Sequence, residues 1–307
     1  QDQVLGPNTD RLETQEAFGF YMQDQIDVSD QWKVLLGLRY DDFSQEVTNR
    51  KNDPATVSKS EETALNPRFG VTYEASDNVS VYASYAEGFR PNSGADASGN
   101  TFDPEESKSY ELGMKISSMD GRLNTTIALF KMEKSNILTA DPVNAGESAA
   151  LGEAESEGLE IDITGELSDS VDMVFSYAYV DAGTSTDLYN FDWAVNLPAG
   201  SELVNVPENS ANLMLTKQFN INGADASLGF TINYVDDRLG ETIDPTYRLP
   251  EYTLVNLFGS YQLNDQVKLT MNIDNLFDEK YYVSSYHKWW TTPGSPTSYV
   301  MGVSYAF

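Results

Sequence analysis

Aromatic and basic side chains gather in the long polar segments of this sequence, and these residues are the best suited to bind a ligand. A ligand with apolar arms needs aromatic walls and a few hydrogen-bond donors. The densest group is Tyr286, His287, Trp289 and Trp290. For any single residue, the alternative is an aromatic girdle or loop-packing role. The candidates are Phe89, Arg90, Tyr189, Trp193, Arg238, Tyr247, Tyr286, His287, Trp289 and Trp290.

Catalytic and metal sites have little support in the residue types. His287 is the one histidine and cysteine is absent, so a transition-metal site lacks a second nitrogen or sulfur ligand. A Ser-His-Asp triad would have to use His287, and no motif supports one. Segment 96–103 lacks the alternating oxygen ligands and terminal Glu of a calcium loop, so we expect a plain loop. The sequence therefore predicts no catalytic residue, no metal site and no enzyme.

The elements that position these loops are strands, and the C-terminal stretch shows their pattern most clearly. Between residues 266 and 275 apolar and polar side chains alternate strictly, and residues 298–307 repeat the pattern up to the aromatic terminus Phe307. A barrel with lipid outside and water inside must keep this alternation through every strand. The apolar members of the first stretch are Val267, Leu269, Met271 and Ile273.

Thirteen segments follow the alternation rule, and they come in pairs. Short turns alternate with long loops along the whole chain, as in outer-membrane barrels with tight periplasmic turns and long extracellular loops. The sequence therefore predicts an all-β, transmembrane antiparallel β-barrel. The expected strands are 14–26, 32–46, a third carrying Phe69 to Tyr73, a fourth carrying Val79 to Tyr85, 108–117, 121–132, 157–167, 171–180, 209–219, 226–234, 252–263, 266–275 and 298–307.

Other all-β folds fit less well. A propeller or solenoid would need a fixed repeat length, which is absent, and a sandwich would need two dry faces packed together. No segment approaches the apolar run of a membrane helix, and the mean hydropathy is −0.42. Barrel strands hide their apolar half by alternation, so these values do not exclude a membrane protein.

The net charge of −29 argues against nucleic acid as a partner. The acidity has two explanations that the sequence leaves open: solvation of the loops, or divalent-cation bridging to anionic lipid head groups at the outer rim. Alternation also places a set of charges inside the barrel, where they avoid lipid. This set is Lys33, Arg39, Arg68, Glu111, Lys115, Glu160, Asp162 and Glu166.

Residues 272–282 (NIDNLFDEKYY) contain the pattern Asn-x-x-Asn-Leu-Phe-Asp-x-x-Tyr. This pattern resembles a stretch of TonB-dependent outer-membrane receptors, in particular the ferric-siderophore branch of the hydroxamate type. Segments 66–73, 81–91 and 104–113 and the Glu-Gly-Leu-Glu run at 157–160 are also similar to the family. Each motif alone is weak, and together they are specific from about Asn66 to the end.

The resemblance implies a bacterial outer-membrane receptor for a ferric siderophore. The family has 22 strands, so residues 1–307 are expected to be the C-terminal part, about 13 strands, with the plug domain and first strands not in this chain. An odd strand count and a start at the extracellular rim agree with this expectation. The alternative function is a passive porin or a surface adhesin barrel.

The resemblance also implies the partners. They are the ferric siderophore as transported ligand, the TonB–ExbB–ExbD system through the missing N-terminal region, and outer-membrane lipid and lipopolysaccharide. No covalently bound cofactor is implied, and the inward charges would hydrogen-bond the plug.

Overall fold

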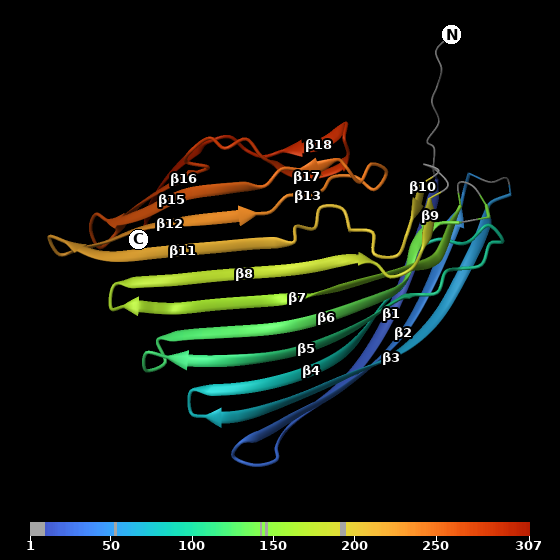
Figure 1. Cartoon of the computed structure of the whole chain (residues 1–307), viewed down its shortest axis with the longest axis horizontal. Coiled ribbons are helices and arrows are strands. Elements are labelled where there is room, and N and C mark those ends of the chain that lie inside the picture. Colours follow the sequence, from blue (N-terminus) through green and yellow to red (C-terminus); the bar gives the residue numbers. More distant parts are fainter. Residues whose placement is uncertain (1–9, 52–53, 142, 145–146, 191–194) are drawn as a thin grey trace, which may run out of the picture.

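One antiparallel sheet of thirteen strands, curved into a trough, makes up most of the computed structural model (Figure 1). The structure describes residues 10–51, 54–141, 143–144, 147–190 and 195–307. Among these residues no helix is long and apolar enough to cross a bilayer. The predicted all-β class and strand number are confirmed. The strands are β1 (Arg11–Asp27), β2 (Trp32–Asn49), β3 (Thr56–Ser76), β4 (Val79–Arg90), β5 (Glu105–Ser118), β6 (Leu123–Ala140), β7 (Ser148–Ser168), β8 (Val171–Thr184), β11 (Asn209–Ile221), β12 (Ala224–Val235), β15 (Tyr252–Gln262), β16 (Val267–Asp274) and β19 (Ser298–Tyr305).

The connections divide into two rims. Six short turns lie at one end of the sheet, where β19 also ends, and the longer connections lie at the other end, where β1 begins (Figure 1). In the turn between β11 and β12, Asn222 and Gly223 have φ values of 54° and 85°, the left-handed pair that a two-residue hairpin turn requires. Consecutive strands are therefore hairpin neighbours, and all the long loops share one rim.

Two of the long loops are shorter than the sequence predicts, because strands extend into them. β3 and β7 have 21 residues each, about twice the 9–11 needed to cross a bilayer. The extensions carry charge rather than apolar alternation, so the pattern misses them. Opposite charges pair across them instead, as between Lys59 and Glu46 (2.7 Å) and between Lys131 and Glu155 (3.0 Å).

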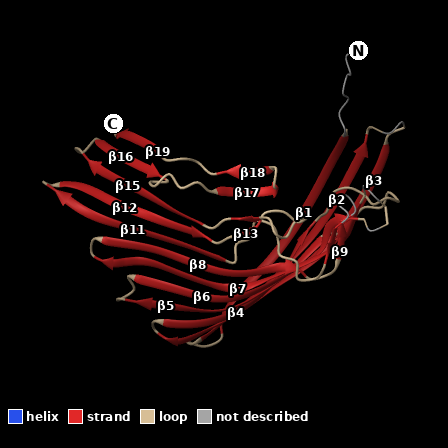
Figure 2. Cartoon of the chain, turned by 45° about the horizontal axis from the view of Figure 1, so that its top comes forward, coloured by secondary structure: helices blue, strands red, loops and turns tan. Residues whose placement is uncertain are grey.

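Three short hairpins stand inside segments that were predicted to be plain loops. They pair β9 (Leu188–Asn190) with β10 (Val195–Leu197), β13 (Arg238–Leu239) with β14 (Arg248–Leu249), and β17 (Tyr282–His287) with β18 (Trp290–Pro293). Each holds its residues by local backbone pairing, separately from the main sheet (Figure 2).

The register sorts the side chains of the sheet by polarity. Leu112 of β5 lies opposite Leu129 of β6, which lies opposite Leu159 of β7, so all three share one face. Leu112 and Leu129 are 53% and 55% exposed. The buried hydrophobic residues of the described chain are few: Phe43, Val47, Phe102, Ala128, Ala226, Leu239 and Leu249. An apolar face of this extent, left open by the fold, is the lipid-facing surface of a barrel wall.

The opposite face is polar. All eight charges predicted to point inward share this face by register and alternation. Tyr82 donates a hydrogen bond to Glu111, and the Lys115 ammonium lies 5.3 Å from the centre of the Tyr82 ring. Gly113 lies opposite Tyr82, and a Cβ there would collide with that ring. Around Tyr82, the lumen side thus holds Glu111 and Lys115 in local polar contacts.

Candidate ligand-binding site at the long-loop rim

The segment 238–249 and the β17–β18 hairpin bring six of the ten candidate residues together. Arg238 and Tyr247 come from the first element, and Tyr286, His287, Trp289 and Trp290 come from the second. Polar contacts join the two elements from the base of the hairpin to its end. We call the three exposed rings at that end, Tyr286, Trp289 and Trp290, the aromatic tip.

Asn275 organises the loop that carries the hairpin. Its side-chain Nδ2 donates to the carbonyls of Glu279 (2.9 Å) and Ser295 (3.0 Å), and its Oδ1 accepts from the Glu279 N–H (2.8 Å). Asn275 and Asp278 both have positive φ (49° and 54°), which Asn and Asp tolerate better than most residues. The Asp278 carboxylate accepts from the Thr297 N–H (3.1 Å). The Asn-Leu-Phe-Asp motif therefore closes the base of this loop.

Two side chains hold the stem of the hairpin. Arg238 is 2% exposed, and its guanidinium donates through Nη2 to the carbonyls of Tyr282 (2.6 Å) and Val283 (3.1 Å). Asn205 pairs with Ser285 in both directions, because its Nδ2 donates to the Ser285 carbonyl (2.7 Å) and its Oδ1 accepts from the Ser285 N–H (2.8 Å). The stem is thus fixed to two other loops through its backbone.

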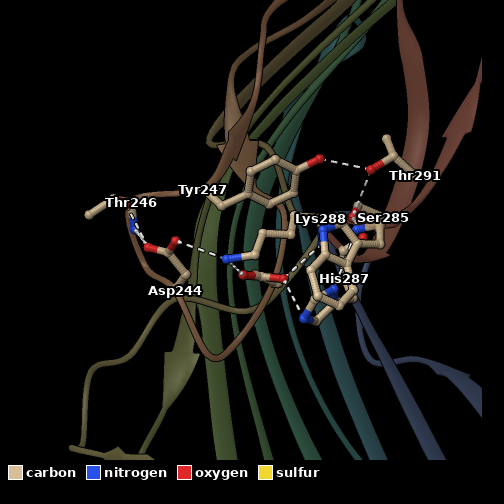
Figure 3. Close-up of polar contacts among 9 residues, drawn as sticks. Asp244, Thr246, Tyr247, Ser285, His287, Lys288 and Thr291 are labelled. Atoms are coloured by element: carbon tan, nitrogen blue, oxygen red, sulfur yellow. Dashed lines mark hydrogen bonds and ion pairs between the residues drawn. The ribbon is translucent and has the colours of Figure 1, made fainter.

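Tyr247 links the same segment to the second strand of the hairpin (Figure 3). Its hydroxyl lies 2.7 Å from the Thr291 hydroxyl, which lies 3.3 Å from that of Ser285. A tight turn positions it: the Tyr247 N–H donates to the Asp244 carbonyl (2.9 Å) with Pro245 second in the turn. Gly240 leaves the space for the Tyr247 ring, since a Cβ there would lie 2.6 Å from it.

Glu241 reaches the end of the hairpin. Its side chain is 1% exposed, and Oε2 accepts from the Lys288 N–H (2.8 Å) and lies 3.4 Å from His287 Nε2. The Lys288 ammonium lies 3.9 Å from both Glu241 Oε1 and Asp244 Oδ2. His287 Nδ1 in turn accepts from the Trp289 N–H (3.3 Å). Figure 3 shows Lys288 and His287 with their polar contacts.

The aromatic tip is displayed to the outside. Trp289 is 82% exposed, and Tyr286 and Trp290 are each 70% exposed. The Tyr286 and Trp290 rings stack with centroids 6.0 Å apart, and the Trp289 ring lies 5.2 Å from that of His287. This arrangement gives apolar surface with polar edges, which suits binding a ligand with apolar groups.

The other four candidates lie elsewhere. Arg90 pairs with Glu105 (2.6 Å), which also binds Lys134 (2.9 Å), and β4 is separated from β12 by β5, β6, β7, β8 and β11. Phe89 shares the face of Tyr85, opposite to Arg90. Tyr189 is on β9, against β6. Trp193 lies outside the described residues.

Sequence reasoning missed Glu241, Asn205, Ser285 and Thr291, which hold the aromatic tip. Only Asn205 carries a conformational peculiarity, a φ of 65°, and that value comes from the structure. Glu241 follows Gly240 in an ordinary polar loop, among 48 acidic residues of the chain. Within the described residues no group of three or more acidic or histidine side chains is placed to hold a metal ion.

The hydrogen bonds between Thr246 and the Asp244 carboxylate are expected to be sensitive to acid. Hydrogen bonds from the Thr246 hydroxyl (2.5 Å) and N–H (3.1 Å) lower the pKa of the Asp244 carboxyl below its usual 3.8. A lowered folded-state pKa stabilises the turn above the unfolded-state pKa, and this stability is lost as pH falls through the folded-state value. We expect amide exchange at Thr246 to accelerate below about pH 4 relative to Asp244→Asn, which lacks the titrating group. An identical pH profile in the variant would contradict this assignment.

Comparison with known proteins identifies the family. Residues 1–276 match the family model described as TonB dependent receptor-like, beta-barrel. The metal-pseudopaline receptor CntO of Pseudomonas aeruginosa is 38% identical over 94% of this chain, and the ferrichrome outer membrane transporter/phage receptor of Escherichia coli is 32% identical over 96%. The chain spans 40% of the length of the first and 39% of the second.

Solved structures agree on the fold. The siderophore receptor PiuA from Acinetobacter baumannii superposes with a TM-score of 0.83 at 27% identity, covering 96% of this chain and 44% of that one. The ferric yersiniabactin uptake receptor FyuA from Yersinia pestis shares the fold alone, with a TM-score of 0.80 at 17% identity over 97% of this chain and 46% of that one. Proteins of this family are transporters rather than enzymes. This chain belongs to the TonB-dependent receptor family of the outer membrane and forms part of its β-barrel.

Proposed function

We propose that the protein containing this chain binds a metal–chelator complex at the long-loop rim and imports it with energy from the TonB–ExbB–ExbD system. The observation that supports this proposal best is the aromatic tip, which is exposed and yet held by buried polar anchors. A binding surface is effective when its side chains are ordered before the ligand arrives. The matched relatives support the same activity, because their names describe receptors for such complexes.

The ligand proposed is a ferric siderophore of the hydroxamate type. Relatives named for ferrichrome and for ferrioxamine B support this class at 32% and 29% identity. A metal–pseudopaline complex is the second candidate, since the relative named for it is 38% identical. The metal complex is cargo in both cases, and no bound cofactor is part of the proposal.

The proposal extends to the rest of the receptor. The thirteen strands would form the C-terminal part of a 22-stranded barrel, with the plug domain and the TonB contact supplied by the remainder of the protein. The inward charges of the polar face would hydrogen-bond that plug, and the apolar face would contact outer-membrane lipid and lipopolysaccharide.

Uptake by the full-length receptor tests the proposed function. Cells with and without the gene would be given radiolabelled ferrichrome, ferrioxamine B or metal–pseudopaline under metal limitation. We expect loss of uptake of one complex on deletion, with its restoration depending on TonB. Unchanged uptake of all three would contradict the proposal. Steady ion conductance of the intact protein in a planar bilayer would instead favour the passive porin.

A further inference from the structure

Glu241 is a buried carboxylate in a rim loop, where water would solvate it at no cost. Burying a charged carboxylate is strongly unfavourable unless hydrogen bonds and charge partners offset it. Here the compensating contacts all come from two consecutive residues: the Lys288 N–H at 2.8 Å, His287 Nε2 at 3.4 Å and the Lys288 ammonium at 3.9 Å. The Glu241 carboxylate therefore makes its compensating contacts with the turn that joins β17 to β18.

The contact acts on the tip and not on the stem. Arg238 holds the stem at Tyr282 and Val283, and Asn205 holds it at Ser285. Beyond these points, Glu241 fixes the turn at 287–288. His287 in turn restrains the backbone of Trp289, because the Trp289 N–H donates a hydrogen bond to His287 Nδ1. Loss of the carboxylate should thus free the tip while leaving the stem in place.

The exposed side chain of Trp289, which lies in this turn, indicates why Glu241 holds the turn in place. Trp289 projects with 82% of its surface exposed, directly between the two residues that contact Glu241 and the stacked Trp290. An exposed indole gains little stability for the protein itself, so the buried charge is not explained by packing. Ordering such a side chain in advance strengthens binding by about two- to tenfold for each immobilised side chain.

We propose that Glu241 is a positioning residue for ligand capture: it touches no ligand and orders the aromatic tip that does. This inference rests on the proposed function in naming a metal–chelator complex as the ligand. Its effect on affinity runs through Trp289 and Trp290. Removal of Glu241 therefore weakens binding only where the indoles contribute to binding.

The test combines a measurement without ligand and one with ligand, both on the full-length receptor in detergent. Hydrogen exchange followed by mass spectrometry reports the amides of 286–291 in Glu241→Ala, where we expect Lys288 to exchange at least about tenfold faster because its acceptor is lost. Glu241→Gln keeps a carbonyl oxygen as acceptor without the charge, so a smaller increase, about threefold, is expected. Glu105→Ala removes another buried carboxylate, on β5, and should leave these amides unchanged.

A double-mutant cycle then separates positioning from general damage. Binding of ferrichrome, ferrioxamine B and metal–pseudopaline is measured for wild type, Glu241→Ala, Trp289→Ala and the double variant. We expect about tenfold weaker binding in each single variant and little further loss in the double variant, because both act through the same side chain. Additive losses, or unchanged affinity in Glu241→Ala beside weakened binding in Trp289→Ala, would overturn the proposal.

Failure of the proposed function and failure of the positioning role of Glu241 give different results. If wild type binds none of the three complexes, the proposed function fails, and the ligand part of this inference fails with it. The exchange result still decides whether Glu241 orders the tip, and unchanged exchange at Lys288 refutes that role whatever the binding data show. If Glu241→Ala does not reach the outer membrane, the same comparisons with Glu241→Gln decide between these outcomes at smaller magnitude.

Discussion

Ile127→Arg is expected to reduce the stability of the barrel by about 2–4 kcal/mol, the cost of a lipid-facing arginine near the bilayer midplane. Ile127 lies on the apolar face between Met114 and Ile161. Along β6 the apolar face runs through Leu123, Thr125, Ile127 and Leu129 before the first charge at Lys131, so Ile127 is central in this band. Urea unfolding of the full-length receptor in liposomes measures the loss.

Thr126→Arg is the matched control, since Thr126 is the preceding residue on the same strand and faces the other way. It lies opposite Lys115 on β5 and Asp162 on β7, among the charges of the polar face. An arginine there can reach water and the Asp162 carboxylate, so a change within about 0.5 kcal/mol is expected. Equal destabilisation by both substitutions would contradict the assignment of the Ile127 face to lipid and the Thr126 face to water.

Arg238→Ala is expected to release the stem of the β17–β18 hairpin and to lower its local opening free energy by about 3–6 kcal/mol. The guanidinium donates to two backbone carbonyls, and hydrogen bonds to a charged group contribute about 1.5–3 kcal/mol each. It also lies over the Tyr252 ring at 5.5 Å, which ties the hairpin to β15. Hydrogen exchange in 282–287 measures the release, and ligand affinity should fall with it.

Arg238→Lys tests whether the forked guanidinium or only its charge matters. An ammonium is a point donor and cannot reproduce the planar fork, so an intermediate effect is expected. Exchange in 282–287 that is unchanged in Arg238→Ala would show that Asn205 and Tyr247 suffice to hold the stem. That result would contradict the role assigned to Arg238.

The sheet could be predicted from the sequence because lipid on one side and water on the other require apolar and polar residues to alternate in every strand. Strict alternation, as at 266–275, locates a strand and its lipid face in one step. The prediction stopped short in β3 and β7, where the strands leave the bilayer and Lys59, Glu61 and Glu155 replace apolar residues. Outside lipid the same backbone pairing continues without the polarity signal, so the strand ends could not be seen.

The candidate site was predictable in composition and not in assembly. The dense aromatic run at 286–290 marked the tip, but its anchors are distant in sequence: Glu241 is 47 positions from Lys288, and Asn205 is 80 positions from Ser285. Such contacts depend on loop paths that periodicity does not encode. Phe89 shows a different limit of residue type as a guide. Its residue type suggests binding, while its strand parity places it on the same face as Tyr85, away from Arg90.

The thirteen-stranded sheet is a membrane wall, and the orientation proposed for it places the long loops and the aromatic tip at the exterior. The chain contains no cysteine, so Trp289→Cys at the tip and Asp265→Cys in the turn between β15 and β16 can each be labelled selectively within it. A membrane-impermeant maleimide applied to intact cells is predicted to label the position-289 variant at once and the position-265 variant only after the outer membrane is permeabilised. Labelling of position 265 in intact cells, with position 289 protected, would contradict the orientation and the receptor function built on it.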